Sequence, residues 1–595
     1  MLPMKKFDPA LRPATRLKHR AVDESLMSGL QGHGLTSLQA RIVAARMSGD
    51  LDEVISHLNP RLEDMSDFHL LADIDIAAQR LATAVITGEP IALFFDYDMD
   101  GIGGGSLSYT LLTEACGCKP DSVRCFVGNR LHDGYGLTES VAEHIKAAQK
   151  TGVVVTIDAG SKDGPRIEML VKAGLDVIVT DHHTIDDIPD KAFACINPQR
   201  PDCRYPDKAV AGGFVVWMLI AATHEVLQSC GHPVSDSGAL LSVWDFAACS
   251  TVADCVSLKS LNNRMIVQRG LTLINHNVRP CWQAIRPLLS EGDINAEDIG
   301  FGISPRVNAT SRISEPDAAL HFLLAENTAE AASWLSVIDG NNVTRKQIES
   351  EMKAIALVKA AEMVADGHYG LAIFLEDGHP GVQGICASRV TEAYGRPSFM
   401  FSPMVDDASL ISGSARSIEA FDSHAALEQV QLKHPSILQK WGGHKAACGA
   451  TLRREDFPVF AAAYEEVVRD QLSESDLGPV VMSDGELAPH ELTLSTVDSL
   501  AELDPFGRGF ESPIFDNTFR IIDVRPVGKV KIHAQLTLLC RGVKMKGIWF
   551  FVREDEEKPL PVMAGQIVHL AYALSDNIYR GRRSLQINIK SLVVL

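Results

Sequence analysis

The sequence predicts an α/β protein of several domains that ends in a small β barrel. Between about residues 86 and 270, short strand-like runs alternate with helical stretches, which is the pattern of a mostly parallel sheet covered by helices. A second, smaller α/β segment follows at about 369–470. The last segment, about 484–595, holds short strands separated by glycine-bearing turns, which is typical of a barrel.

The order of these patterns divides the chain into five predicted parts. The segment before the first sheet is expected to be a helical extension, and the one after it a helical region ending in a long polar helix that could link two lobes. The predicted parts are 1–85, 86–270, 271–365, 366–475 and 484–595. Within them, strands are predicted at 91–95, 122–127, 152–157, 175–180, 192–197, 370–375 and 397–402.

The composition is that of a globular protein without a membrane span. The longest apolar stretch, 209–222, is shorter than the roughly 18–20 residues that a span requires, and it reads as a buried helix. The N-terminus has early lysines but no apolar core after them, so it does not resemble a secretory signal. Twelve cysteines without a C-x-x-C pair favour reduced thiols, and we expect a cytoplasmic protein.

Charge is distributed unevenly along the chain. The net charge of −20 argues against a protein that coats nucleic acid non-specifically. Residues 516–595, however, contain 13 Lys and Arg against 7 Asp and Glu. A basic C-terminal module on an acidic body is compatible with a local anionic partner, although ordinary surface variation would give the same count.

Acidic and imidazole side chains follow three strands of the first predicted sheet. They are Asp96, Asp98 and Asp100 after 91–95, Asp158 after 152–157, and Asp181, His182 and His183 after 175–180. The carboxyl ends of parallel strands lie at one edge of a sheet, where ligands bind. Each group alone would suit a solvated turn, but the same residue types after three strands favour a binding site.

This set of donors suits divalent cations. Carboxylates and imidazoles favour an ion of the Mn²⁺ type, with Mg²⁺ possible, and the absence of thiolates argues against structural zinc. There are more candidate ligands than one octahedral ion needs, so two ions fit, an arrangement used for attack at phosphorus. The glycines of "DGIGGGS" (100–106) could let the backbone approach a ligand and open an anion-binding helix; tight helix–strand packing is the alternative.

Several motifs carry a family resemblance. "DYDMDG", "TIDAG", "TDHH" and "STVADCVSL" resemble the four motifs of the DHH phosphoesterase superfamily. Over roughly residues 85–595 the chain also looks like the RecJ-type single-strand-specific DNA exonucleases. The further motifs are "GNRLHDGYGL", "ISPRVNATSRI", "GVQGICASRV", "SGSARSI", "GGHKAACG" and "DPFGRGFESPIF". The resemblance implies a parallel-sheet DHH catalytic domain, a linker helix, a smaller α/β DHH-associated domain and a C-terminal OB-type barrel.

The resemblance also implies roles in the metal site. The implied metal ligands are Asp98, Asp100, Asp158, His182 and Asp254, and the implied catalytic residues are Asp158, His182 and His183. Asp158 is the best candidate to bridge two ions, and His183 would face the scissile phosphate. Asp96 and Asp181 would support them, Asp181 by orienting a histidine. Asp254 is found through the resemblance alone, because its segment reads as an ordinary helix and loop.

Substrate-binding positions follow from the same motifs. Residues implied to hold the terminal 5′ phosphate and the backbone are Arg130, Arg306, Asn308, Arg312, Ser414, Arg416, Gly443 and His444. A surface ion pair is the alternative for any single arginine. Two departures leave fine contacts open: Ser311 stands where the family usually has glycine, and "FGRGFESP" stands where it has "FGxGNP".

The barrel's aromatic residues are candidates for base stacking. They are Tyr572, Tyr579, Trp549 and Phe550. Core packing is favoured for most of them, because "GIWFFV" reads as a buried strand.

The resemblance implies a metal-dependent 5′-to-3′ exonuclease on single-stranded DNA, in repair or recombination. We expect a monomer, with a helicase or a single-strand-binding protein as partner by family analogy and no membrane. A phosphodiesterase for short oligoribonucleotides or cyclic dinucleotides is disfavoured by the added barrel. A catalytically inactive replication scaffold is disfavoured by the intact ligand set, and a pyrophosphatase would lack "SGSARS" and "GGHKAACG".

Overall fold

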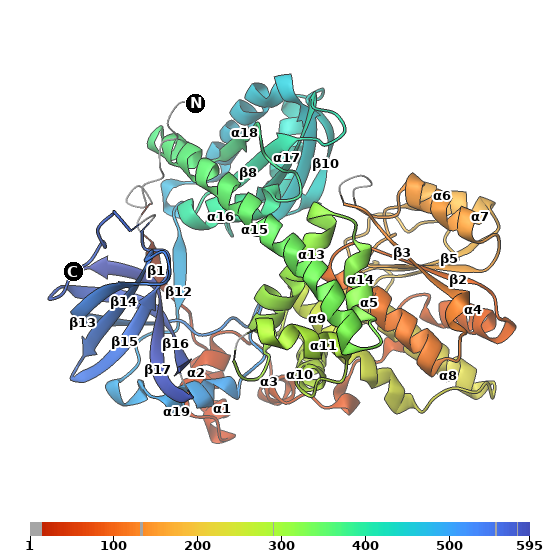
Figure 1. Cartoon of the computed structure of the whole chain (residues 1–595), viewed down its shortest axis with the longest axis horizontal. Helices are drawn as coiled ribbons and strands as arrows, with labels where there is room; N and C mark the ends of the chain where they lie inside the picture. The colour runs from red at the N-terminus through yellow and green to blue at the C-terminus, as the bar shows by residue number, and fades with distance from the viewer. Residues whose placement is uncertain (1–12, 14, 131–134, 290, 554–555, 580) are drawn as a thin grey trace. The chain divides into compact units, whose positions relative to one another are not determined.

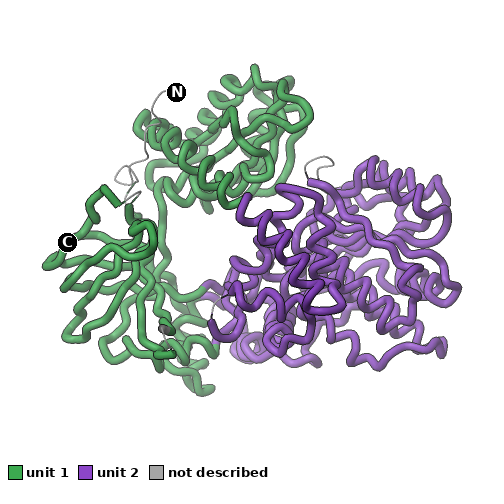
Figure 2. Tube along the Cα trace, in the orientation of Figure 1, with its two compact units in different colours: residues 1–45, 345–502, 512–595 green, residues 46–344, 503–511 purple. Residues whose placement is uncertain are grey.

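A computed structural model of the chain describes residues 13, 15–130, 135–289, 291–553, 556–579 and 581–595 (Figure 1). The chain divides into two compact units (Figure 2). Unit 1 comprises residues 1–45, 345–502 and 512–595, and unit 2 comprises residues 46–344 and 503–511. The boundary between residues 344 and 345 falls inside the long helix α15 (Thr328–Ala365).

Unit 2 is built on a parallel sheet of five strands in the order β3-β2-β4-β5-β6, which confirms the predicted parallel sheet. The strands are β2 (Ile91–Phe95), β3 (Val123–Val127), β4 (Val153–Ile157), β5 (Asp176–Thr180) and β6 (Ala194–Ile196). Every residue of β2 and β4 is buried, since helices cover both faces, and these strands therefore read as continuous apolar runs. The register pairs Phe95 with Ile157 and Ile157 with Thr180, so the carboxyl ends are level.

Helices pack on both faces of this sheet (Figure 1). On one face, α6 (Glu139–Ala148) and α7 (Gly164–Lys172) share an apolar cluster with alternate residues of the strands. On the other lie α4 (Ile74–Thr87), α5 (Met99–Thr110) and α8 (Gly212–Ser229). α8 is buried from residue 212 to residue 224, as predicted for the apolar stretch. In the described part of the chain, no helix has both the length and the apolar character that crossing a membrane would require.

The glycines of α5 are required by packing. A Cβ on Gly104 would lie 2.7 Å from Cγ2 of Ile157, and one on Gly105 would lie 2.5 Å from the ring of Phe95. Because a methyl group has no room there, α5 can approach the sheet only with glycine at these positions. The packing interpretation of "DGIGGGS" is therefore confirmed.

The first turn of α5 has no amide left for an external anion, so the anion-binding interpretation of this loop is wrong. Asp98 is the N-cap, and its Oδ1 accepts the N–H groups of Asp100 (2.9 Å) and Gly101 (3.3 Å). The N–H of Met99 donates to Oδ1 of Asn308 at 2.7 Å. The protein itself satisfies these donors.

The rest of unit 2 is helical and supports α5 and α8. α9 packs on α5, α8 and α10. The buried Asp245 of α9 accepts from Arg279 (2.6 Å) and Trp282 (2.7 Å), so its charge is paired. These helices are α3 (Leu51–Leu58), α9 (Trp244–Ala253), α10 (Leu261–Asn275), α11 (Pro280–Ile285), α12 (Ala296–Asp298), α13 (Ser304–Ile313) and α14 (Asp317–Leu323).

Unit 1 contains a second α/β layer. Its sheet has the order β10-β11-β9-β8-β7, with β7 and β8 parallel and the other pairs antiparallel. The strands are β7 (Leu371–Phe374), β8 (Ser398–Pro403), β9 (Leu410–Arg416), β10 (Leu438–His444) and β11 (Ala447–Arg453). The helices of this layer are α16 (Gln383–Tyr394), α17 (Ser423–Lys433) and α18 (Phe457–Gln471).

The C-terminal strands form a closed barrel in the order β13-β14-β15-β17-β16, which confirms the predicted barrel. They are β13 (Phe515–Val527), β14 (His533–Cys540), β15 (Val543–Trp549), β16 (Ile567–Tyr579) and β17 (Arg582–Val594), and α19 (Leu494–Ala501) contacts β16. Tyr572 is buried and its hydroxyl donates to Asn517 at 2.7 Å, as expected for core packing.

The expectation that Phe550 packs in the core is wrong. β15 ends at Trp549, which is half-buried, and Phe550 beyond the strand is 50% exposed. The apolar run "GIWFFV" is thus a strand that continues into a turn at the barrel's end. The side chain of Tyr579 lies outside the described residues.

The N-terminal part includes a strand that the helical prediction for residues 1–85 missed, although residues 1–12 lie outside the described chain. β1 (Arg16–His19) pairs in parallel with β12 (Val480–Ser483), and two helices follow, α1 (Glu24–Gly32) and α2 (Ser37–Ala44). A strand of four residues is too short for its pattern to identify it.

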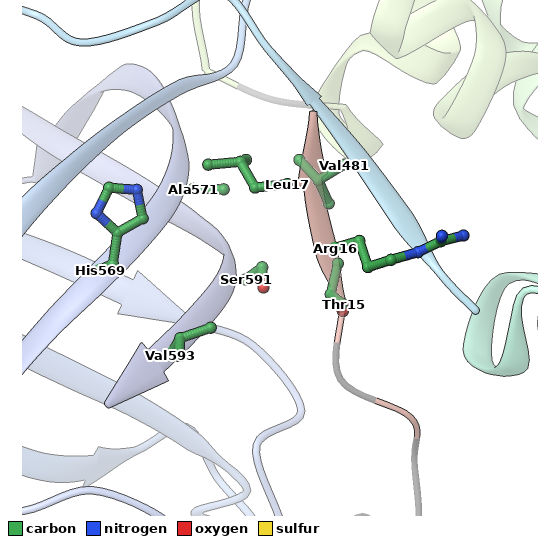
Figure 3. A pocket seen from close by; sticks show the side chains of 8 residues that line it. All are labelled: Thr15, Arg16, Leu17, Val481, His569, Ala571, Ser591 and Val593. Carbon is green, nitrogen blue, oxygen red and sulfur yellow. The ribbon is translucent and has the colours of Figure 1, made fainter. Parts of the chain in front are cut away.

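Side chains of β1 contact the barrel. His19 Nε2 lies 2.9 Å from Oδ1 of Asp516, whose Oδ2 lies 3.0 Å from Nε2 of His569. A pocket of about 20 Å³ separates β1 from β16 and β17 (Figure 3). A larger pocket of about 980 Å³, bordered by β1, β12 and α16, is lined by none of the predicted site residues.

Gly105→Ala is expected to lower the free energy of unfolding of unit 2 by about 1–3 kcal/mol, because the new methyl group would overlap the Phe95 ring. Urea or thermal unfolding followed by circular dichroism measures this change. Gly164→Ala at the start of α7 is the matched control, since a Cβ there meets no atom within 4 Å. Equal stability of the two variants would contradict the packing argument.

Candidate metal centre

The site lies where the strand order of the unit 2 sheet reverses. From β2 the chain first adds β3 on one side and then β4 on the other, so the switch point lies between β2 and β4. In open α/β sheets, ligands bind beyond the carboxyl ends of the strands at such a point. Asp96, Asp98 and Asp100 follow β2, and Asp158 follows β4.

The structure brings the five predicted metal ligands together with Asp96 and His183. In each of three groups, ligand atoms lie within 4.8 Å of one another. The groups are Asp158, His182 and His183; Asp100, His182 and Asp254; and Asp96, Asp98 and Asp158. Asp158 and His182 each belong to two groups, so they are placed to serve neighbouring ions.

Three buried polar atoms of the cluster have no hydrogen-bond partner among the described residues. They are Oδ1 of Asp96, Oδ1 of Asp158 and Nε2 of His182. The last two lie 3.1 Å apart, and the backbone of Asp158 is left-handed, with φ 58°. Leaving buried polar atoms unsatisfied costs free energy, and strain of this kind gathers at functional sites. Divalent cations coordinated by these atoms would satisfy them, so the residues fit the metal that the sequence predicts.

Asp100 is held by the start of α8. Its Oδ2 accepts from the N–H of Gly212 (2.8 Å) and its Oδ1 from that of Gly213 (2.7 Å). A Cβ on Gly212 would lie 2.7 Å from Cβ of Asp158, so α8 also abuts the second strand end. Nε2 of His182 lies 3.7 Å from Asp100 and 3.6 Å from Asp254. Asp254, the C-cap of α9, thereby enters the cluster from a helix far along the chain.

The Asp181 carboxylate accepts hydrogen bonds from its own loop and thereby orients the two histidines. Its Oδ1 accepts from the N–H groups of His182 (2.7 Å) and His183 (3.0 Å) and from Nδ1 of His183 (2.8 Å), and its Oδ2 accepts from the N–H of Ser161 (3.0 Å). Burial raises the pKa of Asp181, but the hydrogen bond and charge of His183 outweigh it and hold the pKa below its usual range. Asp181 is therefore a fixed carboxylate that sets the ring orientation of His183.

Burial and mutual repulsion raise the pKa values of the carboxylates that face the cluster. Burial raises the pKa of Asp158 well above its usual value, and the Asp100 charge adds to this. Burial also raises the pKa of Asp254 to about 7, with His182 opposing. Burial lowers the pKa of His183, but Asp181 and Asp158 raise it to about 9. Negative charge is unfavourable here unless cations accompany it.

Two further residues support His183, and sequence reasoning did not identify either. The hydroxyl of Tyr135 lies 2.9 Å from Nδ1 of His183 and donates to the carbonyl of Asp158 at 3.1 Å. Asn197, just after β6, donates to Oγ of Ser161 and to the carbonyl of His183, both at 2.9 Å. The available signal for Tyr135 was its place in "GNRLHDGYGL", of which residues 131–134 lie outside the described chain.

Of the predicted substrate residues in unit 2, two lie beside the cluster. The guanidinium of Arg130 is 4.8 Å from the centre of the Tyr97 ring, and its charge opposes burial in setting the pKa of Asp96. Arg312 likewise acts on the pKa of Tyr97, which burial raises.

Arg306 and Asn308 have internal partners. The Arg306 guanidinium donates to Asp339 (2.8 Å) and to the carbonyl of Gly302 (2.6 Å). Arg306 thus forms an ion pair, which was the alternative to its predicted role in substrate binding. Asn308 accepts the N–H of Met99 and thus holds the loop that carries Asp98 and Asp100. Ser311, the departure from the family's glycine, is buried in α13.

The four substrate residues predicted in unit 1 gather at one end of its sheet. Arg416 of β9 and His444 of β10 are both paired with Ala447 of β11. Nη1 of Arg416 donates to Oγ of Ser414 at 3.0 Å. Gly443 has φ 137°, and a Cβ there would lie 2.5 Å from the carbonyl of Ala447, so only glycine fits.

Three family models match the chain. They are the DHH family N-terminal domain over residues 90–239, the DHHA1 domain over residues 367–470 and the RecJ OB domain over residues 483–591. The first covers the metal cluster except Asp254.

Relatives match over nearly the whole length. The "Single-stranded-DNA-specific exonuclease RecJ" of Dickeya dadantii (strain 3937) is 34% identical over 589 residues, covering 97% of this chain and 99% of the relative. The protein of the same name from Escherichia coli (strain K12) is 33% identical, covering 98% and 100%. The crystal structure of RecJ in complex with Mn²⁺ from Thermus thermophilus aligns with a TM-score of 0.76 at 25% identity, covering 98% of this chain and 80% of that one.

Mn²⁺ binding is expected to weaken as the pH falls, because protons compete for the same carboxylates. With a pKa of about 7 in the ion-free protein, Asp254 is mostly protonated at pH 6 and mostly ionised at pH 8. The apparent affinity should therefore be roughly tenfold lower at pH 6, as isothermal titration with MnCl₂ would measure.

Asp121→Asn is the control for this titration. Asp121 is exposed and precedes β3, so it lies at the amino ends of the strands, away from the metal centre at their carboxyl ends. It should reproduce the pH dependence of the unmodified protein. Equal Mn²⁺ affinity at both pH values would count against Asp254 as a ligand.

Proposed function

The chain belongs to the family of RecJ single-stranded-DNA-specific exonucleases, and from this premise we propose that it hydrolyses single-stranded DNA from the 5′ end at the metal centre of unit 2. One observation carries the assignment of the site: buried atoms of Asp96, Asp158 and His182 lack partners among the described residues at the switch point of the sheet. The 5′-to-3′ direction rests on the family resemblance.

We propose Asp98, Asp100, Asp158, His182 and Asp254 as the residues that hold two ions of Mn²⁺ or Mg²⁺. The donor set and the Mn²⁺ complex of the Thermus relative support this assignment. Asp158 is the proposed bridging ligand, since it belongs to two of the three groups. When bound, the ions would activate the attacking water and offset the negative charge that develops on the phosphate.

The chain's own residues prepare the phosphate for attack. Asp181 and Tyr135 lie 2.8 and 2.9 Å from Nδ1 of His183, and the Tyr135 hydroxyl lies 3.4 Å from Nε2. With Nδ1 held by Asp181, Nε2 is the nitrogen proposed to donate to a phosphate oxygen. The raised pKa of His183, about 9, favours the cationic form that such an interaction requires. Asn308 supports the loop that carries Asp98 and Asp100 by accepting the N–H of Met99. Asp96 is the proposed supporting carboxylate beside Asp98 and Asp158.

Both units contain residues that we propose to bind the substrate. In unit 2, Arg130 and Arg312 lie beside the metal cluster, whereas Arg306 is already paired with Asp339. In unit 1, the proposed site for the terminal 5′ phosphate is the sheet end that carries Ser414, Arg416, Gly443 and His444. Guanidinium groups and a glycine backbone suit a phosphate.

The barrel is proposed to bind single-stranded DNA through stacked bases. Phe551 is 71% exposed although its backbone is left-handed, with φ 53°. Its N–H donates to Nδ1 of His533 at 3.0 Å, and the His533 ring lies 5.2 Å from Phe550 and 4.7 Å from Phe551. An aromatic side chain held outward in this way suits stacking on a base, and the excess of Lys and Arg in residues 516–595 suits the phosphates.

The competing functions fit less well. A phosphodiesterase for short oligonucleotides needs no closed barrel, and the inactive scaffold is disfavoured because the whole predicted ligand set gathers. We further propose a cytoplasmic monomer in DNA repair or recombination, working with a helicase or a single-strand-binding protein. The twelve unpaired cysteines agree with a reducing compartment.

Asp158→Asn is expected to lower exonuclease activity at least about 100-fold, because it removes the charge shared by two metal groups. The measurement is release of labelled nucleotides from 5′-labelled single- and double-stranded DNA with Mn²⁺ or Mg²⁺. Asp121→Asn should retain full activity. If the unmodified protein degrades no single strand from its 5′ end, or if Asp158→Asn is fully active, the proposed function fails.

Phe551→Ala is expected to weaken binding of a single-stranded oligonucleotide about 5- to 20-fold, through loss of base stacking, without a change in Mn²⁺ affinity. Fluorescence anisotropy of a labelled oligonucleotide measures it. The control is Leu432→Ala, which removes a comparably exposed apolar side chain from α17. Unchanged binding by Phe551→Ala would show that Phe551 is not part of the DNA-binding site.

A further inference from the structure

The segment "LDPFGRGFE" (503–511), here called the strap, contains none of the proposed metal-binding or substrate-binding residues. It lies between two segments of unit 1 but belongs to unit 2. The fully buried Arg264 of α10 fastens it, donating to the carbonyls of Leu503 (2.8 Å) and Pro505 (3.2 Å) and lying 4.6 Å from the centre of the Phe510 ring. Burial lowers the pKa of Arg264 to about 10, because removing a cation from water costs free energy. The chain thus buries a charged group where it holds the strap.

The tip of the strap is a tight turn. Gly507 and Phe510 exchange backbone hydrogen bonds of 3.0 and 3.1 Å, which leaves Arg508 and Gly509 at the tip. Gly509 has φ 79°, and a Cβ there would lie 2.8 Å from Oγ of Ser257. The tip thus lies flat on the loop of residues 254–260 and has a defined backbone conformation.

This loop begins with a proposed metal ligand. Its Leu258 donates its N–H to the carbonyl of Arg508 at 2.8 Å, and its own carbonyl accepts from Arg264 at 3.4 Å. Leu258 is four residues beyond Asp254. The strap tip is therefore connected to the metal centre by a short loop, which is hydrogen-bonded both to the tip and to Arg264.

Arg508 presents an unneutralised charge at this border. Its side chain is exposed and makes no hydrogen bond or ion pair with the residues that the structure describes. Four arginines of unit 2 do pair with carboxylates, at 2.5–2.8 Å; they are Arg80, Arg200, Arg279 and Arg306.

A second cation lies beside it. Lys259 is exposed, and its stem passes 3.4 Å from where a Cβ on Gly509 would lie. Neither cation has a carboxylate partner among the described residues, although the chain as a whole has a net charge of −20. Both are therefore available for an external anion, next to a centre that acts on a polyanion.

We propose that Arg508 binds a backbone phosphate of the single-stranded DNA next to the metal centre, with Lys259 as a weaker second contact. This inference rests on the proposed function and adds a substrate-binding residue to it. A guanidinium can bind two phosphate oxygens at once, and the fixed backbone of the tip reduces the entropy lost on binding.

Arg508→Gln tests the proposal by removing the charge at similar side-chain length. KM for a 5′-labelled single strand is expected to rise about 3- to 10-fold with kcat within about twofold. The log–log salt dependence of oligonucleotide binding, measured in the Asp158→Asn background, should become shallower by about 0.7. Mn²⁺ affinity and the melting temperature should stay unchanged, and Arg508→Lys should recover part of the binding.

Arg61→Gln is the matched control, because Arg61 is an exposed arginine of unit 2 that pairs with Glu63 instead. An unchanged KM and salt slope for Arg508→Gln would overturn the proposal. So would loss of Mn²⁺ binding or a lower melting temperature, which would make the residue structural. An unmodified protein without nuclease activity would instead refute the proposed function; an active one unaffected by Arg508→Gln refutes this inference alone.

Discussion

Buried negative charge at the switch point of the parallel sheet is the constraint on which unit 2 depends. Asp96, Asp100 and Asp158 are buried, and burial raises the pKa of each. The charge of Asp98 adds to this for all three, and that of Asp100 adds to it for Asp158. The protein positions the carboxylates mainly with backbone amides, as for Asp100 at the start of α8. Neutral donors orient an oxygen without cancelling its charge, so the charge remains available to cations.

The same constraint explains the close packing around the site. α5 and α8 must approach the strand ends closely for Asp98 to cap one helix and for the other to hold Asp100, and Gly105 and Gly212 permit this approach. The packing of this layer and the position of the proposed ligands therefore depend on the same residues: a methyl group added here would displace both a helix and a proposed ligand. His183 is fixed in a similar way, by hydrogen bonds of its ring to Asp181 and Tyr135.

Positive charge also occurs in the parts of the chain that are proposed to bind DNA. The barrel is basic, the sheet end of unit 1 carries Arg416 and His444, and the strap returns to unit 2 with Arg508 at its tip. Arg416 lies at the end of a strand and Arg508 in a glycine-bearing turn, so the backbone of each has a defined conformation. Each of these places, taken by itself, suits a phosphate of a polyanionic strand.

The sequence by itself determined the class of the fold and most of the metal cluster. Apolar runs of five residues mark buried parallel strands, and residues just after such strands share one edge, so Asp98, Asp158 and His182 could be grouped without coordinates. Asp254 required a family resemblance, because nothing in its own helix signals a ligand. The tertiary structure alone decided that Tyr135 and Asn197 support His183, that Phe550 is exposed, that Arg306 is already paired and that the strap presents Arg508. The reason is physical: periodicity is a local property of the chain, whereas these contacts join residues that only packing brings together.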